Sequence, residues 1–174
     1  DDVLREGQIV NLDITLEKNG FITDSSTTYL VGEVPYPARR LVQATYQAMW
    51  KGIAAVRPGA HTGDIGHAIA RFAREQGYTV VKEYCGHGIG REMHEEPQIL
   101  HYGHRGTGVE LQEGMVFTIE PMLNQGKAAI CHQPDAWPVH TRDGKLSAQF
   151  EHTVAVTSTG VRVLTLRKGE RAPK

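Results

Sequence analysis

The chain has 174 residues, of which 40% are apolar and 22% charged, and a formal net charge of −1. It is long enough for one domain with a sizeable core, and its nearly neutral charge excludes the basic surface typical of nucleic-acid-binding proteins. The 2 cysteines are too few for a disulfide framework and no apolar stretch approaches ~20 residues, so we expect a cytoplasmic protein without a membrane partner.

Residues 8–31 predict a β-hairpin whose strands flank the dipeptide Asn19-Gly20. This dipeptide favours a two-residue hairpin turn, and the segments on either side are rich in β-branched and apolar residues. With this turn Lys18 faces Phe21, and every other pairing in the hairpin follows from that one.

This register places two acids, Asp13 and Asp24, on the same face of the hairpin. Asp24 faces Thr15, and Asp13 is a diagonal neighbour, ~7–8 Å away at the backbone. Ile14 and Leu16 then point to the opposite face, where we expect a core. Because like charges close together destabilise a sheet, the two acids are either solvated on an open face or relieved by a cation or a proton.

Two amphipathic helices are predicted next, because apolar residues recur there at spacings of three and four. The first covers residues 38–56 and ends at the sequence Arg-Pro-Gly, 57–59. The second begins at Thr62 as N-cap and ends at Gly77 in the C′ position. We expect both helices to pack against a sheet and to carry no catalytic residue.

The segment GHGIGREMHEEPQ, residues 86–98, combines glycines at alternate positions with His87 and His94. Glycine weakens both helices and strands and allows sharp bends of the backbone. We therefore predict a shaped loop that presents His87. A glycine-rich surface turn that happens to hold histidines is the alternative.

Two later segments predict apolar strands that each carry a glutamate. In residues 115–122, MVFTIEPM, Glu120 ends the strand directly before a proline, which cannot donate to a sheet ladder. In residues 147–157, SAQFEHTVAVT, Glu151 interrupts a similar pattern. Because glutamate is depleted in strands and costly to bury unpaired, both positions indicate a functional site.

Two segments are predicted to lack regular structure. Residues 123–146 are rich in Gly, Asn, Asp and Pro and are predicted to be a loop, in which Trp137 is an aromatic that should pack against another group. The tail after Leu166 is predicted to be a solvated terminus.

The residues that are costly in these settings can form one metal site: Asp13, Asp24, His87, Glu120 and Glu151. Four carboxylates and one imidazole can coordinate two divalent cations, whose charge removes the repulsion among the acids. Such ligands suit Mn²⁺ or Fe²⁺ and also admit Co²⁺ or Zn²⁺. Two metals ~3.5–4 Å apart can hold a bridging hydroxide and polarise a carbonyl, which is one route to amide hydrolysis.

Successive segments of the chain resemble the motifs of type I methionine aminopeptidases: EGQIVNLDIT, TDSSTTYLVG, EYCGHGIGREMHEEPQILHY, EGMVFTIEPM and LSAQFEHTVAVT. The resemblance extends over nearly the whole chain. It implies an α/β pita-bread (creatinase/aminopeptidase-like) fold, in which helices pack on one face of an antiparallel sheet. It also implies a single metallopeptidase domain over residues 1–174 that removes N-terminal methionine from nascent polypeptides.

The same resemblance implies a role for each site residue. The implied metal ligands are Asp13, Asp24, His87, Glu120 and Glu151. Glu120 is also the implied acid–base residue, which passes a proton from the attacking water to the leaving amine. His94 would contact the substrate and stabilise the developing oxyanion. Met93 and Trp137 fall where the family builds its methionine pocket.

The resemblance also implies about 80 further residues before Asp1 that form the symmetric partner half of the fold, and without them a sheet edge and an apolar face are left open. We therefore expect an N-terminally incomplete fold. Either a second chain supplies the missing half, or the fold has rearranged, or the protein is a truncated form. The chain alone should bind metal and have weak or absent activity.

Two alternatives stay open at this point. Proline-specific peptidases (prolidase or aminopeptidase P) share the pattern of metal ligands, although the residues around His87 favour the methionine enzyme. A non-catalytic binding module on the same fold would usually have lost ligands, and here every ligand position is filled.

Overall fold

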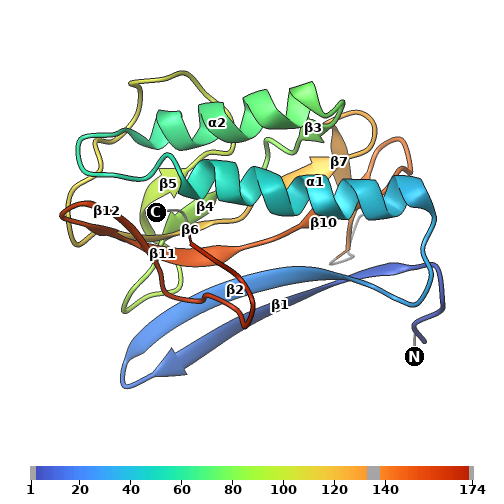
Figure 1. Cartoon of the computed structure of the whole chain (residues 1–174), viewed down its shortest axis with the longest axis horizontal. Coiled ribbons are helices and arrows are strands. Elements are labelled where there is room, and N and C mark those ends of the chain that lie inside the picture. Colours follow the sequence, from blue (N-terminus) through green and yellow to red (C-terminus); the bar gives the residue numbers. More distant parts are fainter. Residues whose placement is uncertain (1–2, 133–137, 173–174) are drawn as a thin grey trace.

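The computed structural model describes residues 3–132 and 138–172 (Figure 1). A long hairpin and two helices come first: β1 (Ile9–Lys18), β2 (Phe21–Leu30), α1 (Tyr36–Ile53) and α2 (Thr62–Glu75). The later elements are short strands: β3 (Thr79–Val80), β4 (Gly86–Gly88), β5 (Glu95–Ile99), β6 (Val116–Ile119), β7 (Met122–Asn124), β8 (Ile130–His132), β9 (Val139–Thr141), β10 (Ser147–Gln149), β11 (His152–Thr157) and β12 (Gly160–Val163).

The described strands pair only in the antiparallel sense. One sheet has the order β12-β11-β6-β4-β5, a second has the order β10-β7-β3, and β8 and β9 form a separate ribbon. The helices α1 and α2 lie side by side over one face of these strands, and the β1–β2 hairpin lies on the other side (Figure 1). The predicted α/β class, with helices on one face of antiparallel strands, is confirmed.

The hydrophobic core lies between the helices and the strands. Both helices and β6 contribute many of its fully buried side chains: Leu41, Met49, Ile53, Ile65, Ile69, Phe117 and Ile119. Burial of each such side chain stabilises the fold by about 1.5–3 kcal/mol relative to leaving it exposed. Among the described helices, none is long and apolar enough to cross a membrane.

The helix ends differ slightly from the prediction. α1 begins at Tyr36, two residues earlier than predicted. The N-cap of α2 is His61 rather than the predicted Thr62, because the Asp64 carboxylate accepts the His61 backbone N–H at 2.8 Å and caps the first turn. Gly77 lies just after the helix with φ of 80°, the left-handed conformation that the predicted C′ position requires.

The β1–β2 hairpin has the predicted register, with Thr15 opposite Asp24. Asn19 has φ of 55° and Gly20 has φ of 75°. These left-handed conformations match a two-residue turn, and an Asn-Gly dipeptide adopts them at low cost. Local turn chemistry therefore sets which residues of the hairpin share a face.

The expectation that Ile14 and Leu16 face a core is wrong. Their exposed fractions are 53% and 61%, and that of Leu12 beside them is 50%. Among the described strands β1 pairs only with β2, and β2 makes most of the hairpin's contacts with β10, β11 and α1. Leu12, Ile14 and Leu16 therefore form an exposed apolar row on the outer face of β1.

The glycine-rich segment was predicted to be a loop, but it is not a loop throughout, because Gly86 and Gly88 lie in strand β4. A Cβ atom at Gly86 would overlap the Thr118 carbonyl, and one at Gly88 would overlap the Glu96 carbonyl. Glycine weakens an isolated strand, but here the neighbouring strands lie too close for any side chain. Only residues 89–94 connect β4 to the next strand.

Three further predictions are corrected by the structure. Residues 123–146 include β8 and β9 rather than loop alone, because backbone pairing across the segment forms a ribbon that its composition does not reveal. Residues 147–157 form two strands, and Glu151 lies at the break between them. The tail after Leu166 is not simply solvated, because Arg167 hydrogen-bonds to backbone carbonyls of the folded strands.

Candidate metal centre

The structure brings the predicted ligands into one cluster on β1, β2 and β4, directly after β6 and directly before β11: Asp13, Asp24, His87, Glu120 and Glu151. One ligand atom from each of Asp24, His87 and Glu151 lies within 4.8 Å of the others. His87 Nε2 is 3.5 Å from Glu120 Oε1. The Asp13 carboxyl interacts with those of Asp24 and Glu151. Their role as metal ligands stays a prediction.

Asp24 is held by neutral donors and by a two-way bond to β11. The Thr15 hydroxyl donates to Asp24 Oδ1 at 3.1 Å, and the Ser25 backbone N–H donates to the same oxygen at 3.0 Å. The Asp24 N–H donates to Thr153 Oγ1 at 3.0 Å, and the Thr153 hydroxyl donates to the Asp24 carbonyl at 2.7 Å. These bonds fix β2 against β11 at the level of the cluster.

Glu120 is buried at the end of β6 and is oriented by three neighbours. The Thr118 hydroxyl donates to Oε1 at 2.7 Å, and Gln149 Nε2 donates to Oε2 at 3.3 Å. The Glu120 backbone N–H donates to His101 Nε2 at 3.2 Å. Burial lowers the pKa of His101 to about 3, so the ring is neutral at pH 7 and can accept this bond.

His87 presents Nε2 to the acids. Its Nδ1 lies 3.0 Å from the Gly88 carbonyl, which can only accept, so the proton of the neutral ring belongs on Nδ1. Burial lowers the pKa of His87 and favours this neutral form. Nε2 then carries the lone pair that metal coordination requires.

The carboxyl groups of the cluster perturb one another. Burial raises the pKa of Glu120 and of Glu151, and the charges of the neighbouring acids raise both further. Burial and the charge of Asp24 likewise raise the pKa of Asp13. In the described part of the chain, no lysine or arginine forms an ion pair with these acids. A donor set of crowded carboxylates and one imidazole therefore fits divalent cations.

The loop after β4 carries two residues that the sequence predicts to contact a substrate. The His94 ring lies 4.5 Å from the His87 ring, centroid to centroid, at 72°. Met93 is 39% exposed. Glu95 Oε1 accepts two backbone N–H groups of this loop, at 2.8 and 2.9 Å, which holds the loop in place. Trp137, the third predicted contact, lies outside the described residues.

Several supporting residues were not predicted as part of the site. Thr118 and Thr153 each lie two residues from a site glutamate in sequence, so the alternation of side chains along a strand provided a signal for both. Gln149 likewise precedes Glu151 by two residues. His101 lies in irregular structure between β5 and β6, where no periodicity in the sequence identifies it.

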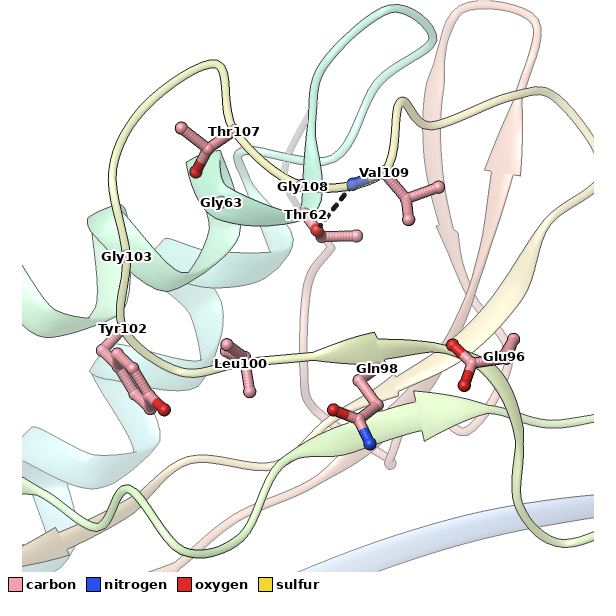
Figure 2. Close-up of a pocket in the computed structure, with 10 residues that line it drawn as sticks. All are labelled: Thr62, Gly63, Glu96, Gln98, Leu100, Tyr102, Gly103, Thr107, Gly108 and Val109. Atoms are coloured by element: carbon pink, nitrogen blue, oxygen red, sulfur yellow. Dashed lines mark hydrogen bonds between the residues drawn. The ribbon is translucent and has the colours of Figure 1, made fainter.

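A separate cavity of about 440 Å³ lies between β5 and the loop that follows it (Figure 2). Glu96, Gln98 and Leu100 line one side. Thr62 and Val109 line the other, where the Val109 backbone N–H donates to Thr62 Oγ1 at 3.2 Å. None of the clustered ligand candidates lines this cavity, so it is not part of the candidate metal centre.

Residues 1–158 match the family model described as metallopeptidase family M24. Over 164 residues the chain is 54% identical to methionine aminopeptidase B of Synechocystis sp., and the match covers 94% of this chain and 60% of that protein. It is 48% identical over 171 residues to the methionine aminopeptidase of Escherichia coli K12, with coverages of 98% and 65%. The chain thus spans 60 to 65% of the length of these curated relatives.

Solved structures of a methionine aminopeptidase and a prolidase also match this chain. The crystal structure of methionine aminopeptidase from Rickettsia prowazekii matches with a TM-score of 0.92 and 52% identity, over 94% of this chain and 66% of that one. The prolidase from Pyrococcus furiosus matches with a TM-score of 0.74 and 26% identity, over 97% of this chain and 43% of that one.

Proposed function

Because the chain belongs to metallopeptidase family M24, we propose that it acts in removing N-terminal methionine from nascent polypeptides in the cytoplasm. The pita-bread fold predicted from the sequence is confirmed over the part of the relatives that the chain covers. The choice of methionine is supported by 48 to 54% identity to methionine aminopeptidases, against 26% to a prolidase. The convergence of Asp24, His87 and Glu151 within 4.8 Å carries the proposal of a metal-dependent hydrolase.

The clustered acids and imidazole would hold two divalent cations, with Mn²⁺, Fe²⁺, Co²⁺ and Zn²⁺ as the chemically suitable ions. The proposed ligands are Asp13, Asp24, His87, Glu120 and Glu151. When bound, such cations polarise the scissile carbonyl and lower the pKa of water. The protein's contribution is orientation, because Thr15, Thr118 and Gln149 fix the carboxyl groups through neutral hydrogen bonds.

Glu120 is the proposed acid–base residue of the reaction. A general acid–base group works best when its pKa lies near the working pH, and burial together with the neighbouring acids raises the pKa of Glu120 towards that range. Glu120 would take a proton from the attacking water and give it to the leaving amine. The bonds from Thr118 and Gln149 keep both of its oxygens at fixed positions during this transfer.

The loop after β4 would bind the substrate. His94 lies beside His87 and can donate a ring N–H to the carbonyl oxygen on which negative charge develops. The exposed Met93 offers an adaptable apolar contact for a methionine side chain. Trp137 is the further pocket residue that the sequence resemblance implies.

The exposed apolar row on β1 is the proposed contact for the additional half that the longer relatives possess. Leu12, Ile14 and Leu16 are each at least half exposed, and the same face of the hairpin carries Phe21 and Tyr29 at 56% and 50%. Water-exposed apolar patches of this kind mark surfaces that another element covers. A preceding segment or a second chain would supply that cover, and we expect the described chain alone to bind metal but to turn over substrate weakly.

Metal titration of the purified chain tests the proposal directly. After removal of metal with EDTA, the chain should take up two equivalents of Mn²⁺ or Co²⁺, measured by calorimetry and elemental analysis. Asp24→Asn and Glu151→Gln should each lose uptake, because they remove proposed ligands. Glu113→Gln, at an exposed turn residue, is the matched control and should bind like the unmodified chain.

Peptide hydrolysis by the metal-loaded chain distinguishes the candidate functions. A Met-Ala-Ser peptide should be cleaved more readily than an Xaa-Pro dipeptide, and the rate should rise when the N-terminal segment of a longer relative is added. Cleavage of Xaa-Pro alone would assign the chain to the prolidase type. Failure to take up metal at all would indicate a non-catalytic binding module instead.

A further inference from the structure

The segment after β12 folds back over the strands that carry the candidate metal centre. The Leu164 N–H donates to the Thr153 carbonyl at 2.9 Å, and the Thr153 N–H donates to Thr165 Oγ1 at 3.0 Å. This pairing extends beyond the end of β12 and brings Arg167 to the junction of β2 and β11. The Arg167 side chain is only 23% exposed there.

One nitrogen of Arg167 joins the two backbone segments that carry site acids. Ser26 and Glu151 already exchange backbone bonds, with the Glu151 N–H donating to Ser26 O at 2.9 Å and the Ser26 N–H donating to Glu151 O at 3.4 Å. Arg167 Nη2 donates to both of these carbonyls, at 2.6 Å to Ser26 and 2.9 Å to Glu151. A charged donor therefore reinforces a backbone pair that has one long bond.

Two neighbours fix the guanidinium itself. Glu170 Oε1 accepts Arg167 Nη1 at 3.1 Å, and Glu170 Oε2 accepts the Arg167 backbone N–H at 2.7 Å. His152 Nε2 lies 3.2 Å from both Arg167 Nη1 and Glu170 Oε2. The fully buried His152 ring packs against Trp50 of α1, with 5.3 Å between ring centroids. Arg167 is thus anchored to the core rather than lying free on the surface.

The position of this contact matters because Glu151 lies at a break in the sheet. It falls between β10 and β11, where the neighbouring strands do not hold it in a continuous ladder. Asp24 lies two residues before Ser26 on the same face of β2. Asp24 and Glu151 reach the same cluster from these two segments, and the guanidinium ties the segments together from the backbone side.

We propose that Arg167 is a positioning residue for the metal centre, which holds the Ser26–Glu151 backbone pair together so that Asp24 and Glu151 stay within reach of one cation. This inference rests on the proposed function, because it concerns the metal affinity of the same cluster. Residues that support metal ligands without touching the ion typically change its affinity about 10- to 100-fold when they are replaced.

Cobalt titration of Arg167→Met tests this role, with Lys168→Met as the matched control. Both variants lose one positive charge, but Lys168 is exposed and lies next to Arg167 in sequence. Arg167→Met should bind Co²⁺ about 10- to 100-fold more weakly and show an altered visible absorption spectrum. Lys168→Met should match the unmodified chain in both, and Arg167→Lys should fall between, since one ammonium cannot replace both guanidinium nitrogens.

Two results would overturn the inference. The first is unchanged Co²⁺ affinity and spectrum in Arg167→Met, including the case in which only the melting temperature of the metal-free variant falls, because a purely structural role predicts that outcome. The second decides the matter if Arg167→Met fails to fold: it is Co²⁺ binding by both Arg167→Lys and Glu170→Gln that equals binding by the unmodified chain. Absence of Co²⁺ binding by the unmodified chain would instead refute the proposed function.

Discussion

Replacing Glu151 with glutamine should stabilise the metal-free chain at high pH while removing its stabilisation by metal. Burial and the neighbouring acids raise the pKa of Glu151 above its ordinary 4.5 in the folded state, whereas the unfolded chain ionises near that ordinary value. The folded state therefore holds the proton more tightly. This contribution to stability is complete below about pH 4.5 and is lost progressively as the pH rises towards the folded-state pKa of about 10.

The size of the effect follows from the linkage of proton binding to folding. When a carboxyl keeps its proton only in the folded state, the free energy of unfolding falls by about 1.4 kcal/mol for each unit by which the pH rises. Glu151 is 1% exposed, so solvent screens its environment little. Between pH 7 and pH 9 one such group costs up to about 3 kcal/mol. Glutamine has nearly the same shape and cannot ionise, so Glu151→Gln lacks this slope.

Urea denaturation of the EDTA-treated chain at pH 7, 8 and 9 measures this slope. The unmodified chain and Glu113→Gln should lose stability with rising pH more steeply than Glu151→Gln. The raised pKa of the Cys85 thiol affects all three proteins alike and cancels in the comparison. Mn²⁺ at about 100 times its dissociation constant should restore about 3 kcal/mol to the first two proteins but not to Glu151→Gln. Equal slopes for Glu151→Gln and the unmodified chain would refute the argument.

Three further outcomes follow from the packing. Gly88→Ala should destabilise the chain by about 1–3 kcal/mol in thermal denaturation, whereas Gly160→Ala, whose added Cβ meets no atom within 4 Å, should change little. His101→Leu should cost about 1–3 kcal/mol in urea denaturation, because the buried Glu120 N–H loses its acceptor, and an unchanged midpoint would contradict that role. Leu16→Glu should shift stability by less than about 0.5 kcal/mol, and a large loss would mean that the apolar row is covered in solution.

The parts of the fold set by local chemistry were predictable from the sequence. The dipeptide Asn19-Gly20 determines a turn, the turn determines the register, and the register places Asp13 and Asp24 on one face. The C′ position of Gly77 is also local, because only the helix before it matters. The acids of the site were identifiable because charge is unusual within apolar strands.

The predictions that failed depend on contacts between segments that are distant in the sequence. Gly88 forms a strand because the Glu96 carbonyl approaches it closely, and no pattern within the segment reveals that neighbour. Ile14 is exposed because no described element packs on the outer face of β1, although an apolar residue in a strand favours burial. Arg167 follows an apolar strand in a charged tail, and only the folded chain shows the carbonyls that it binds.

The way the site is held together explains why the proposed site would favour cations. Neutral groups such as Thr15, Thr118 and Gln149 orient its carboxyl groups, and Arg167 contacts Glu151 at the backbone carbonyl rather than at the carboxyl group. These contacts fix positions without neutralising the negative charge. At neutral pH the balancing charge must therefore come from bound protons or bound metal, and each metal ion that enters must displace protons. Metal affinity should consequently rise with pH across the range in which the buried glutamates titrate, and proton release measured during metal titration tests this coupling.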